Sequence, residues 1–149
     1  MSFSAFHYAM QKLKIPLGCP CGGPSYATCC GPFIDGAAMA PNAEALMRSR
    51  YTAYALRKET YLRSTWHPST RPPDAIISDN EQLQWLGLEV KSALRLRQRK
   101  VKQDTGSDRD SVEFVARYKV NGRACRLHEL SCFVREGGRW FYVDGSFPD

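Results

Sequence analysis

The sequence predicts an α+β fold in which helices come first and an antiparallel sheet follows. Apolar residues recur every three or four positions between residues 42 and 58, which is the period of a helix. From residue 85 onward they alternate with polar residues, which is the period of a strand. The dipeptides Asn121-Gly122 and Gly137-Gly138 divide this second half and are typical of two-residue hairpin turns.

The helical half begins with a predicted amphipathic helix over residues 2–13, which Pro16 and Gly18 end. The best-defined helix follows Asn42, which suits the N-cap, and carries its apolar residues at positions 43, 47, 51 and 54. A second short helix is expected from about residue 59 to residue 65. Pro68 then biases His67 away from helical conformation, so the helical half ends there.

Four strands are expected in the second half. The first is long, from Trp85 to Arg97, with apolar residues on one face and charged residues on the other. The second carries Val112, Phe114, Ala116, Tyr118 and Val120 on one side, the third covers residues 123–135, and the last covers residues 140–144. Cys125 and Cys132 on the third strand are interpreted as buried free thiols.

The chain has 149 residues, enough for one main core, and a net charge of +6. It contains no apolar run near the roughly 20 residues that span a bilayer, so no membrane segment is expected. The first fifteen residues lack the basic-then-apolar order of a signal peptide, which predicts a cytoplasmic protein. In that reducing compartment clustered cysteines favour metal binding over disulfides.

Four of the six cysteines lie within twelve residues, as Cys19-Pro20-Cys21 and Cys29-Cys30. A structural zinc ion takes four thiolates in a tetrahedron, and the glycines and prolines here provide the turns that this requires. The alternatives are four unliganded thiols or a redox site, but the Cys-x-x-Cys pattern of redox sites is lacking. We predict one structural zinc ion held by Cys19, Cys21, Cys29 and Cys30.

These cysteine pairs resemble the SEC-C motif, a zinc knuckle found at the C-terminus of the translocase ATPase SecA and in many bacterial proteins. Its pattern is Cys-x-Cys, a loop of about eight residues, then Cys-Cys or Cys-His. Residues 22–28 make the loop of this chain one residue shorter than usual. The resemblance implies the same four ligands with a different loop geometry.

Further segments resemble the bacterial YchJ family over residues 17–147. They are Cys-Cys-Gly-Pro (29–32), Ala-Leu-Met-Arg-Ser-Arg-Tyr (45–51), Thr-Trp-His-Pro-Ser (65–69), Trp-Leu-Gly-Leu-Glu (85–89), Val-Glu-Phe-Val-Ala-Arg-Tyr (112–118), Leu-His-Glu-Leu-Ser (127–131) and Trp-Phe-Tyr-Val-Asp-Gly (140–145). The resemblance implies an N-terminal helix and knuckle (1–31) packed on a cone-shaped nuclear transport factor two-like domain (32–149), with helices against a curved four-stranded antiparallel sheet. The family has no assigned biochemical function, and cones of this type include enzymes, ligand binders and interaction modules.

A ligand or substrate in such a cone would meet aromatic and titratable side chains. The candidate pocket residues are Arg48, Tyr51, Tyr54, Trp66, His67, His128, Glu129, Tyr142 and Asp144. Adjacent residues of a strand point to opposite faces, so His128 and Glu129 cannot serve one pocket. His67 instead suits a helix end, the tyrosines suit a core, and Arg48 and Arg50 suit either an anion or an ion pair with Glu129 or Asp144.

Three functions are compatible with these features. The leading hypothesis is a cytoplasmic zinc protein whose knuckle docks on a protein partner, beside a cone that is a scaffold or binds a small molecule. The alternative is an enzyme of the isomerase, dehydratase or hydrolase type, with His67 or Asp144 as acid or base. A third is nucleic-acid or ribosome binding through a basic face of Arg95, Arg97, Arg99 and Lys100.

Overall fold

The computed structural model describes residues 18–78, 83–91 and 107–148. Its elements are η1 (Tyr26–Thr28), α2 (Gly31–Ile34), α3 (Ala43–Ala55), α4 (Glu59–Ser64), β1 (Leu83–Val90), β2 (Arg109–Val120), β3 (Arg123–Glu136) and β4 (Arg139–Ser146). Helices precede strands, and the strands form one antiparallel sheet in the order β1-β2-β3-β4. This confirms the predicted α+β class and the meander.

The hairpin turns of the sheet adopt the left-handed backbone that their sequences predict. Asn121 and Gly122 have φ values of 50° and 84°, and Gly137 and Gly138 have values of 59° and 78°. Positive φ at both central residues matches the right-handed twist of the flanking strands. The register that results places Phe114 opposite Glu129 and Ala116 opposite Leu127, so these residues share one face of the sheet.

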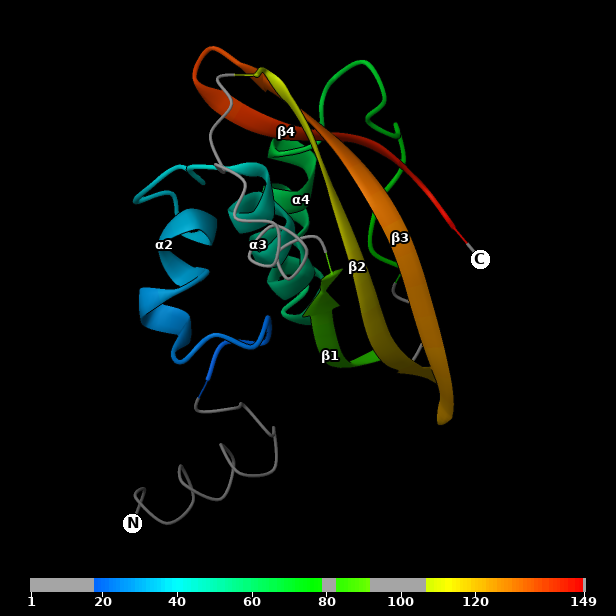
Figure 1. The fold of residues 1–149 in the computed structure, drawn as a ribbon. Coiled ribbons are helices and arrows are strands. Elements are labelled where there is room, and N and C mark those ends of the chain that lie inside the picture. Colours follow the sequence, from blue (N-terminus) through cyan, green and yellow to red (C-terminus); the bar gives the residue numbers. More distant parts are fainter. Residues whose placement is uncertain (1–17, 79–82, 92–106, 149) are drawn as a thin grey trace, which may run out of the picture.

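Helix α3 lies across this face of the curved sheet, as Figure 1 shows. Asn42 caps it as predicted, since its Oδ1 accepts a hydrogen bond from the backbone nitrogen of Ala45 at 2.8 Å. The helix ends at Ala55, and Arg57 follows with a φ of 60°. The chain therefore turns sharply after α3 into the shorter helix α4.

The segment after α4 extends the sheet at the β4 edge. The backbone nitrogen of His67 donates to the oxygen of Tyr142 at 2.7 Å, and the nitrogen of Tyr142 donates to the oxygen of Thr65 at 2.8 Å. These bonds fix the end of α4 against β4. The sheet and the two helices therefore enclose the space between them from several sides.

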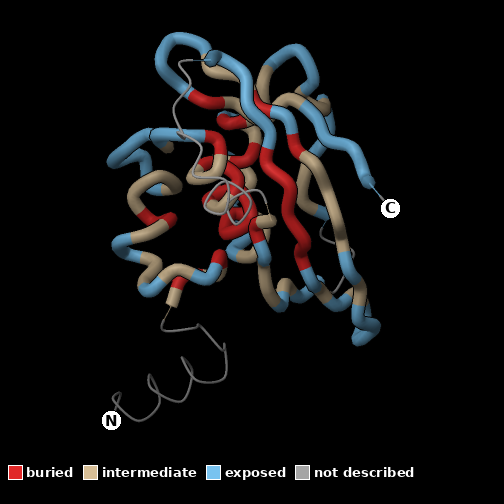
Figure 2. Tube along the Cα trace, viewed as in Figure 1, coloured by how far each residue is buried: buried red, intermediate tan, exposed pale blue. Residues whose placement is uncertain are grey.

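One core joins the sheet, α3 and the cysteine segment (Figure 2). Leu46 and Met47 from α3 and Phe133 from β3 are each at most 4% exposed. Cys21 and Cys30 belong to the same cluster, each with 1% exposure. The cysteine segment therefore packs against the sheet domain rather than standing apart from it.

Two expectations need correction. β1 begins at Leu83, earlier than the strand predicted from Trp85, and ends at Val90; residues 92–97 of that predicted strand lie outside the described residues. Cys132 is exposed although its neighbours Ser131 and Phe133 are buried, because its side chain lies on the opposite face of β3, and Cys125 near the start of β3 is half-buried. The predicted helix over residues 2–13 and the basic face at residues 95–100 lie outside the described residues. No helix among the described residues has the length and apolarity that crossing a membrane requires.

Candidate metal centre and ligand cavity

The four clustered cysteines come from two tight turns that face each other. Cys19 and Cys21 lie in a turn closed by two backbone bonds, from Gly22 N to Cys19 O and from Cys19 N to Gly23 O, both 2.9 Å. Gly22 has a φ of 102°, which this turn requires and which an L side chain rarely adopts. Cys29 and Cys30 follow η1 directly and precede α2.

The four Sγ atoms lie within 4.8 Å of one another. Cys21 Sγ is 3.5 Å from Cys29 Sγ and 3.6 Å from Cys30 Sγ, and Cys29 Sγ is 3.9 Å from Cys30 Sγ. Sulfurs that surround one zinc ion tetrahedrally at about 2.3 Å are about 3.8 Å apart. The donor set and its spacing therefore fit a metal ion with four thiolate ligands.

The close approach of the four sulfurs shifts the pKa values of three of the thiols in opposite directions. The Cys30 thiol hydrogen-bonds to Cys21, which lowers the pKa of Cys21 to about 5. The same bond raises the pKa of Cys30, and burial followed by the Cys21 sulfur raises the pKa of Cys29 to about 11. Negative charge on the Cys21 sulfur thus favours protonated Cys29 and Cys30. A divalent cation removes this conflict and allows all four to be thiolates.

Helix α3 supports this cluster from the protein side. The Thr52 hydroxyl donates to Cys30 Sγ at 3.2 Å, and Cys19 Sγ lies 3.6 Å from the same oxygen. Arg48 Nη1 donates to the backbone oxygen of Cys21 at 3.2 Å, while its Nε pairs with Glu44 at 2.9 Å. Hydrogen bonds of this kind orient metal ligands and tune their charge.

A second feature lies on the other side of α3, where a cavity of about 260 Å³ separates the helix from the sheet. The helix contributes Met47, Arg50, Tyr51 and Tyr54, and the sheet contributes Trp85, Phe114, Ala116, Leu127, Glu129, Ser131, Phe133 and Tyr142. Aromatic rings make up half of these twelve side chains. The cone is therefore hollow, and its lining is mostly apolar with a few polar groups, the usual composition of a ligand pocket.

Arg50 is the buried cation of this cavity, with only 5% of its surface exposed. Its Nη1 donates to Leu62 O at 2.8 Å and to Thr65 Oγ1 at 2.7 Å. The guanidinium carbon lies 4.7 Å from the ring centroid of Tyr142, and burial lowers the pKa of the group. Neutral groups thus hold a buried charge in place beside empty space.

Glu129 supplies the carboxylate from the opposite wall. Its Oε2 accepts from the Ser131 hydroxyl at 2.5 Å and from the Tyr142 hydroxyl at 3.4 Å. Burial, and after it the Glu129 carboxylate, raises the pKa of Tyr142, so this phenol stays protonated and donates. Gly145 leaves room for the carboxylate, because a Cβ there would collide with Glu129 Oε2.

The structure brings together some of the predicted pocket residues and separates others. Tyr51, Tyr54, Glu129 and Tyr142 line the cavity. Arg48 lies at the knuckle, and Trp66 packs behind Arg50 at 5.2 Å without joining the lining. The candidate pocket set omitted two important lining residues, Arg50 and Trp85. Arg50 could have been found from the sequence, because it is a charged residue at helical spacing from the apolar residues of the same helix.

The titratable groups favoured for catalysis lie elsewhere. His67 bonds Ser69 at 2.7 Å and Glu136 at 3.0 Å outside the cavity, and His128 bonds Glu113 at 2.7 Å. His128 and Glu129 do point to opposite faces, as predicted. Asp144 is exposed and pairs with Cys132 in the sheet register. Neither His67 nor Asp144 can therefore act as acid or base in this cavity.

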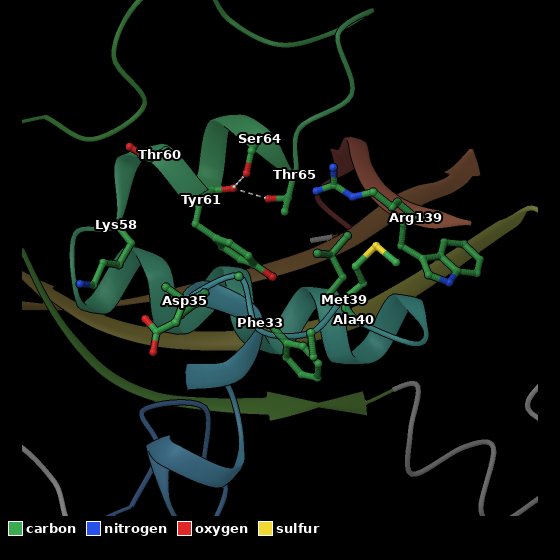
Figure 3. A pocket seen from close by; sticks show the side chains of 15 residues that line it. Phe33, Asp35, Met39, Ala40, Lys58, Thr60, Tyr61, Ser64, Thr65 and Arg139 are labelled. Atoms are coloured by element: carbon green, nitrogen blue, oxygen red, sulfur yellow. Dashed lines mark hydrogen bonds between the residues drawn. The ribbon is translucent and has the colours of Figure 1, made fainter. Parts of the chain in front are cut away.

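Figure 3 shows a second, larger cleft of about 470 Å³ between the segment after the knuckle, α4 and β4. Its charged lining residues, Asp35, Lys58 and Arg139, are all exposed. The hydroxyls of Ser64 and Thr65 both donate to Tyr61 O. Trp140 Nε1 is buried without an acceptor among the described residues. With no buried ion in its lining, this cleft is a weaker ligand site than the cavity.

Comparisons with known proteins agree with this two-part architecture. Residues 42–145 match the family described as "YchJ, middle NTF2-like domain". The chain belongs to the YchJ family. Family relatives named UPF0225 protein include one from Chromobacterium violaceum, 53% identical over 91% of this chain and 96% of the relative, and one from Methylibium petroleiphilum, 55% identical over 87% and 88%.

Solved structures extend the likeness of this YchJ-family chain to the knuckle. A SEC-C motif containing protein from Rhodopseudomonas palustris is 32% identical, with a TM-score of 0.64 over 89% of this chain and 99% of that one. A SEC-C motif containing protein from Psychrobacter arcticus is 25% identical, also with a TM-score of 0.64, over 89% and 83%. The predicted family, knuckle motif and cone-shaped fold are therefore confirmed.

Proposed function

We propose that this YchJ-family protein binds a small molecule in the cavity between α3 and the sheet, and that its knuckle carries one structural zinc ion. The observation that supports binding most strongly is Arg50. It is 5% exposed, faces the cavity and forms no ion pair among the described residues. A buried charge without an ionic partner is costly, so a polar ligand group that reaches Arg50 would stabilise the protein.

The zinc ion has a bracing role in this proposal. Four cysteines fill the coordination shell of a structural site, so no position remains for a catalytic water. Thr52 links two of these sulfurs to α3, the helix that also carries Arg50. The metal would therefore hold in place the helix that forms one wall of the cavity.

Binding is tested by titrating a set of small aromatic compounds into isotope-labelled, zinc-loaded protein and following amide and Trp85 indole resonances. We expect the shift changes to concentrate at the cavity residues of α3, β1 and β3. The same titration of Arg50→Lys should weaken binding, because lysine loses the planar fork that grips an acceptor. Arg117→Lys, at an exposed position of β2, is the matched control and should bind as the parent does.

Two results would contradict the proposal. One is a set of compounds that leaves the cavity resonances unmoved at any concentration. The other is binding that maps to the larger cleft of Figure 3, around Tyr61 and Arg139, and is indifferent to Arg50.

The predicted docking of the knuckle on a protein partner stays a prediction. The exposed knuckle positions are Gly22, Pro24, Ala27 and Thr28, none of which is charged. A partner would therefore recognise backbone and shape there rather than charge. Chemical crosslinking from Thr28→Cys, compared with Cys132, which is exposed on the inner strand β3, tests this surface.

A further inference from the structure

The charges of the cavity are arranged as a separated pair. Arg50 projects from α3 and Glu129 from β3, so a cation and a carboxylate face the same hollow from opposite walls. No ion pair joins them, and each is bound instead by neutral groups. Opposite charges in a poorly hydrated space attract strongly, so these bonds hold the two ions apart against that attraction.

The neutral partners make this separation part of the resting structure. Leu62 O and Thr65 Oγ1 take two bonds from one nitrogen of Arg50, and the Tyr142 ring lies beside the guanidinium. Arg50 also hydrogen-bonds to the Tyr54 side chain, another lining residue, while Ser131 and Tyr142 both bond the same carboxylate oxygen of Glu129. Side chains that are already fixed in this way lose little conformational entropy when a ligand binds.

The net charge of the pair limits what fits between the two walls. The charges of Arg50 and Glu129 sum to zero. An anionic ligand would therefore be attracted by Arg50 and repelled by Glu129, and a cationic ligand would be repelled by Arg50 and attracted by Glu129. A neutral group that accepts at one end and donates at the other gains at both ends. Charge-assisted hydrogen bonds of this kind are roughly twice as strong as neutral ones.

The walls and the size of the cavity narrow the shape of the ligand. Tyr51 and Trp85 meet edge to face at 5.4 Å at one side, and Phe133 and Tyr142 do so at 5.8 Å at the other. Rings that line a slot favour a flat apolar body, because it contacts their faces and edges. A volume of about 260 Å³ lies below the range that drug-sized ligands occupy, which points to a body of one ring.

We propose that the cavity selects a small, planar, uncharged molecule with a hydrogen-bond acceptor next to an N–H donor, as in an aromatic carboxamide or a cyclic amide. The acceptor meets Arg50 and the N–H meets Glu129. This inference rests on the proposed function and adds the chemical class of the ligand. It differs from a plain anion site, which Arg50 alone would form.

Four probes of nearly equal shape separate these classes: benzamide, acetophenone, benzoate and benzamidinium. Benzamide offers both groups, acetophenone only the acceptor, benzoate an anionic acceptor and benzamidinium only donors. Dissociation constants come from the Trp85 indole resonance of zinc-loaded protein. We expect benzamide to bind at least about tenfold more tightly than each of the other three, since each of them loses one charged hydrogen bond or gains repulsion.

Two variants check that this preference comes from the separated pair. In Glu129→Gln the cavity keeps Arg50 but loses its carboxylate, so benzoate should overtake benzamide. Glu136→Gln removes an exposed carboxylate outside the cavity and should keep the order of the parent protein.

The outcomes separate this inference from the proposed function. Benzoate as the tightest probe of the parent, or equal binding of benzamide and acetophenone, overturns the ligand class but leaves an Arg50-dependent cavity. Benzamidinium as the tightest probe overturns it as well, because Glu129 would then dominate. If none of the four binds while the wider set of compounds does, the class alone fails. If nothing moves the cavity resonances, both proposals fail.

Discussion

The knuckle and the cavity lie against the same helix but are built in different ways. The knuckle takes its four clustered cysteines from twelve consecutive residues and depends on turns that glycine and proline permit. The cavity takes its lining from residues between Met47 and Tyr142, contributed by α3 and all four strands. One site is therefore local, whereas the other is non-local and exists only once the sheet has closed on the helix.

This difference predicts different responses to damage. A small loop with few apolar residues gains its stability from metal binding, so it should unfold when a ligand is lost. Most of the shared core consists of apolar residues from α3 and the strands, so the sheet domain should survive that loss. Thr52 and Arg48 are the contacts through which one region would affect the other.

The largest effect is expected for Cys30→Ser. Structural zinc contributes on the order of 10–16 kcal/mol in small metal domains, and serine is a poor zinc ligand. We expect metal content to fall from one zinc per chain to none and hydrogen exchange to rise over residues 18–31, with the strands still protected. Metal analysis and hydrogen exchange measure this.

Cys125→Ser is the matched control, because this half-buried cysteine lies on β3 far from the cluster in the sequence. It should keep its zinc. Loss of protection in β2 and β3 of Cys30→Ser would show that the knuckle and the sheet domain unfold as one cooperative unit, and that the sheet domain does not survive loss of the metal.

Arg50→Met should destabilise the sheet domain rather than the knuckle. The change removes the donor to Leu62 O and Thr65 Oγ1, and a buried acceptor left unpaired costs about 1–3 kcal/mol. Urea unfolding measures the loss, and zinc content should stay at one per chain. Arg117→Met, at an exposed position of β2, should change stability by less than about 0.5 kcal/mol. Equal losses of stability in the two variants would show that the hydrogen bonds of Arg50 do not stabilise the sheet domain.

Gly145→Ala tests the space that Glu129 needs. An added Cβ would collide with the Glu129 carboxylate, which must then shift from its position beside Ser131. We expect benzamide binding to fall to the level of acetophenone. Gly87→Ala on β1 meets nothing within 4 Å and should leave the preference intact. An unchanged preference in Gly145→Ala would mean that Glu129 does not contact the probe.

Thr52→Val probes the link between the two regions. It removes the hydroxyl that donates to Cys30 Sγ but keeps the shape of the side chain. Loss of such an outer hydrogen bond lowers metal affinity by about 10-fold to 100-fold. Competition with a chelator measures this, and Thr52→Ser, which keeps the hydroxyl, should retain most of the affinity. Equal affinities in the two variants would show that the hydroxyl is not used.

The smallest effect concerns Glu59 at the start of α4. Its carboxylate accepts from the backbone nitrogens of Ile76 at 3.0 Å and Ile77 at 2.9 Å, and these bonds lower its pKa. A pKa that is lower in the folded state adds stability above the unfolded value of about 4.3, and that stability is lost as the pH falls through the folded value. Glu59 is partly exposed, so the expected loss is below about 1 kcal/mol.

The contribution of Glu59 is measured from the free energy of unfolding at pH 7 and at pH 3, in the parent protein and in Glu59→Gln. The variant should lose less stability than the parent over that interval. Identical losses would show that these bonds do not persist in solution.

Much of the fold could be predicted because its signals are local. Asn42 caps α3, Asn121-Gly122 turns the β2–β3 hairpin, and the alternating apolar residues of β2 face inward, all as the sequence indicates. The cysteine spacing likewise predicted a metal cluster whose sulfurs the fold brings together. Strand ends were harder, since β1 begins at Leu83, before the Trp85 from which the alternation was counted.

The candidate pocket was predicted only in part. Tyr51 and Tyr54 were found because their helical spacing places them on one face. His128 and Glu129 were both candidates of which only one could serve the pocket, and the structure places Glu129 there. His67 and Asp144 were favoured by their chemistry, but contacts with Ser69, Glu136 and the sheet edge place them outside. Residue type alone does not tell which side of an edge strand a group will face.

The sequence by itself determined the class of the fold, the four cysteines of a cluster that can hold a metal ion, and the family. Each of these depends on residues close together in the chain or on a pattern repeated along it. Only the tertiary structure decided that the cone is hollow, that Arg50 is its buried cation and that Glu129 faces it without pairing. These facts depend on how far α3 stands from the sheet, which is set by the packing of side chains from distant segments.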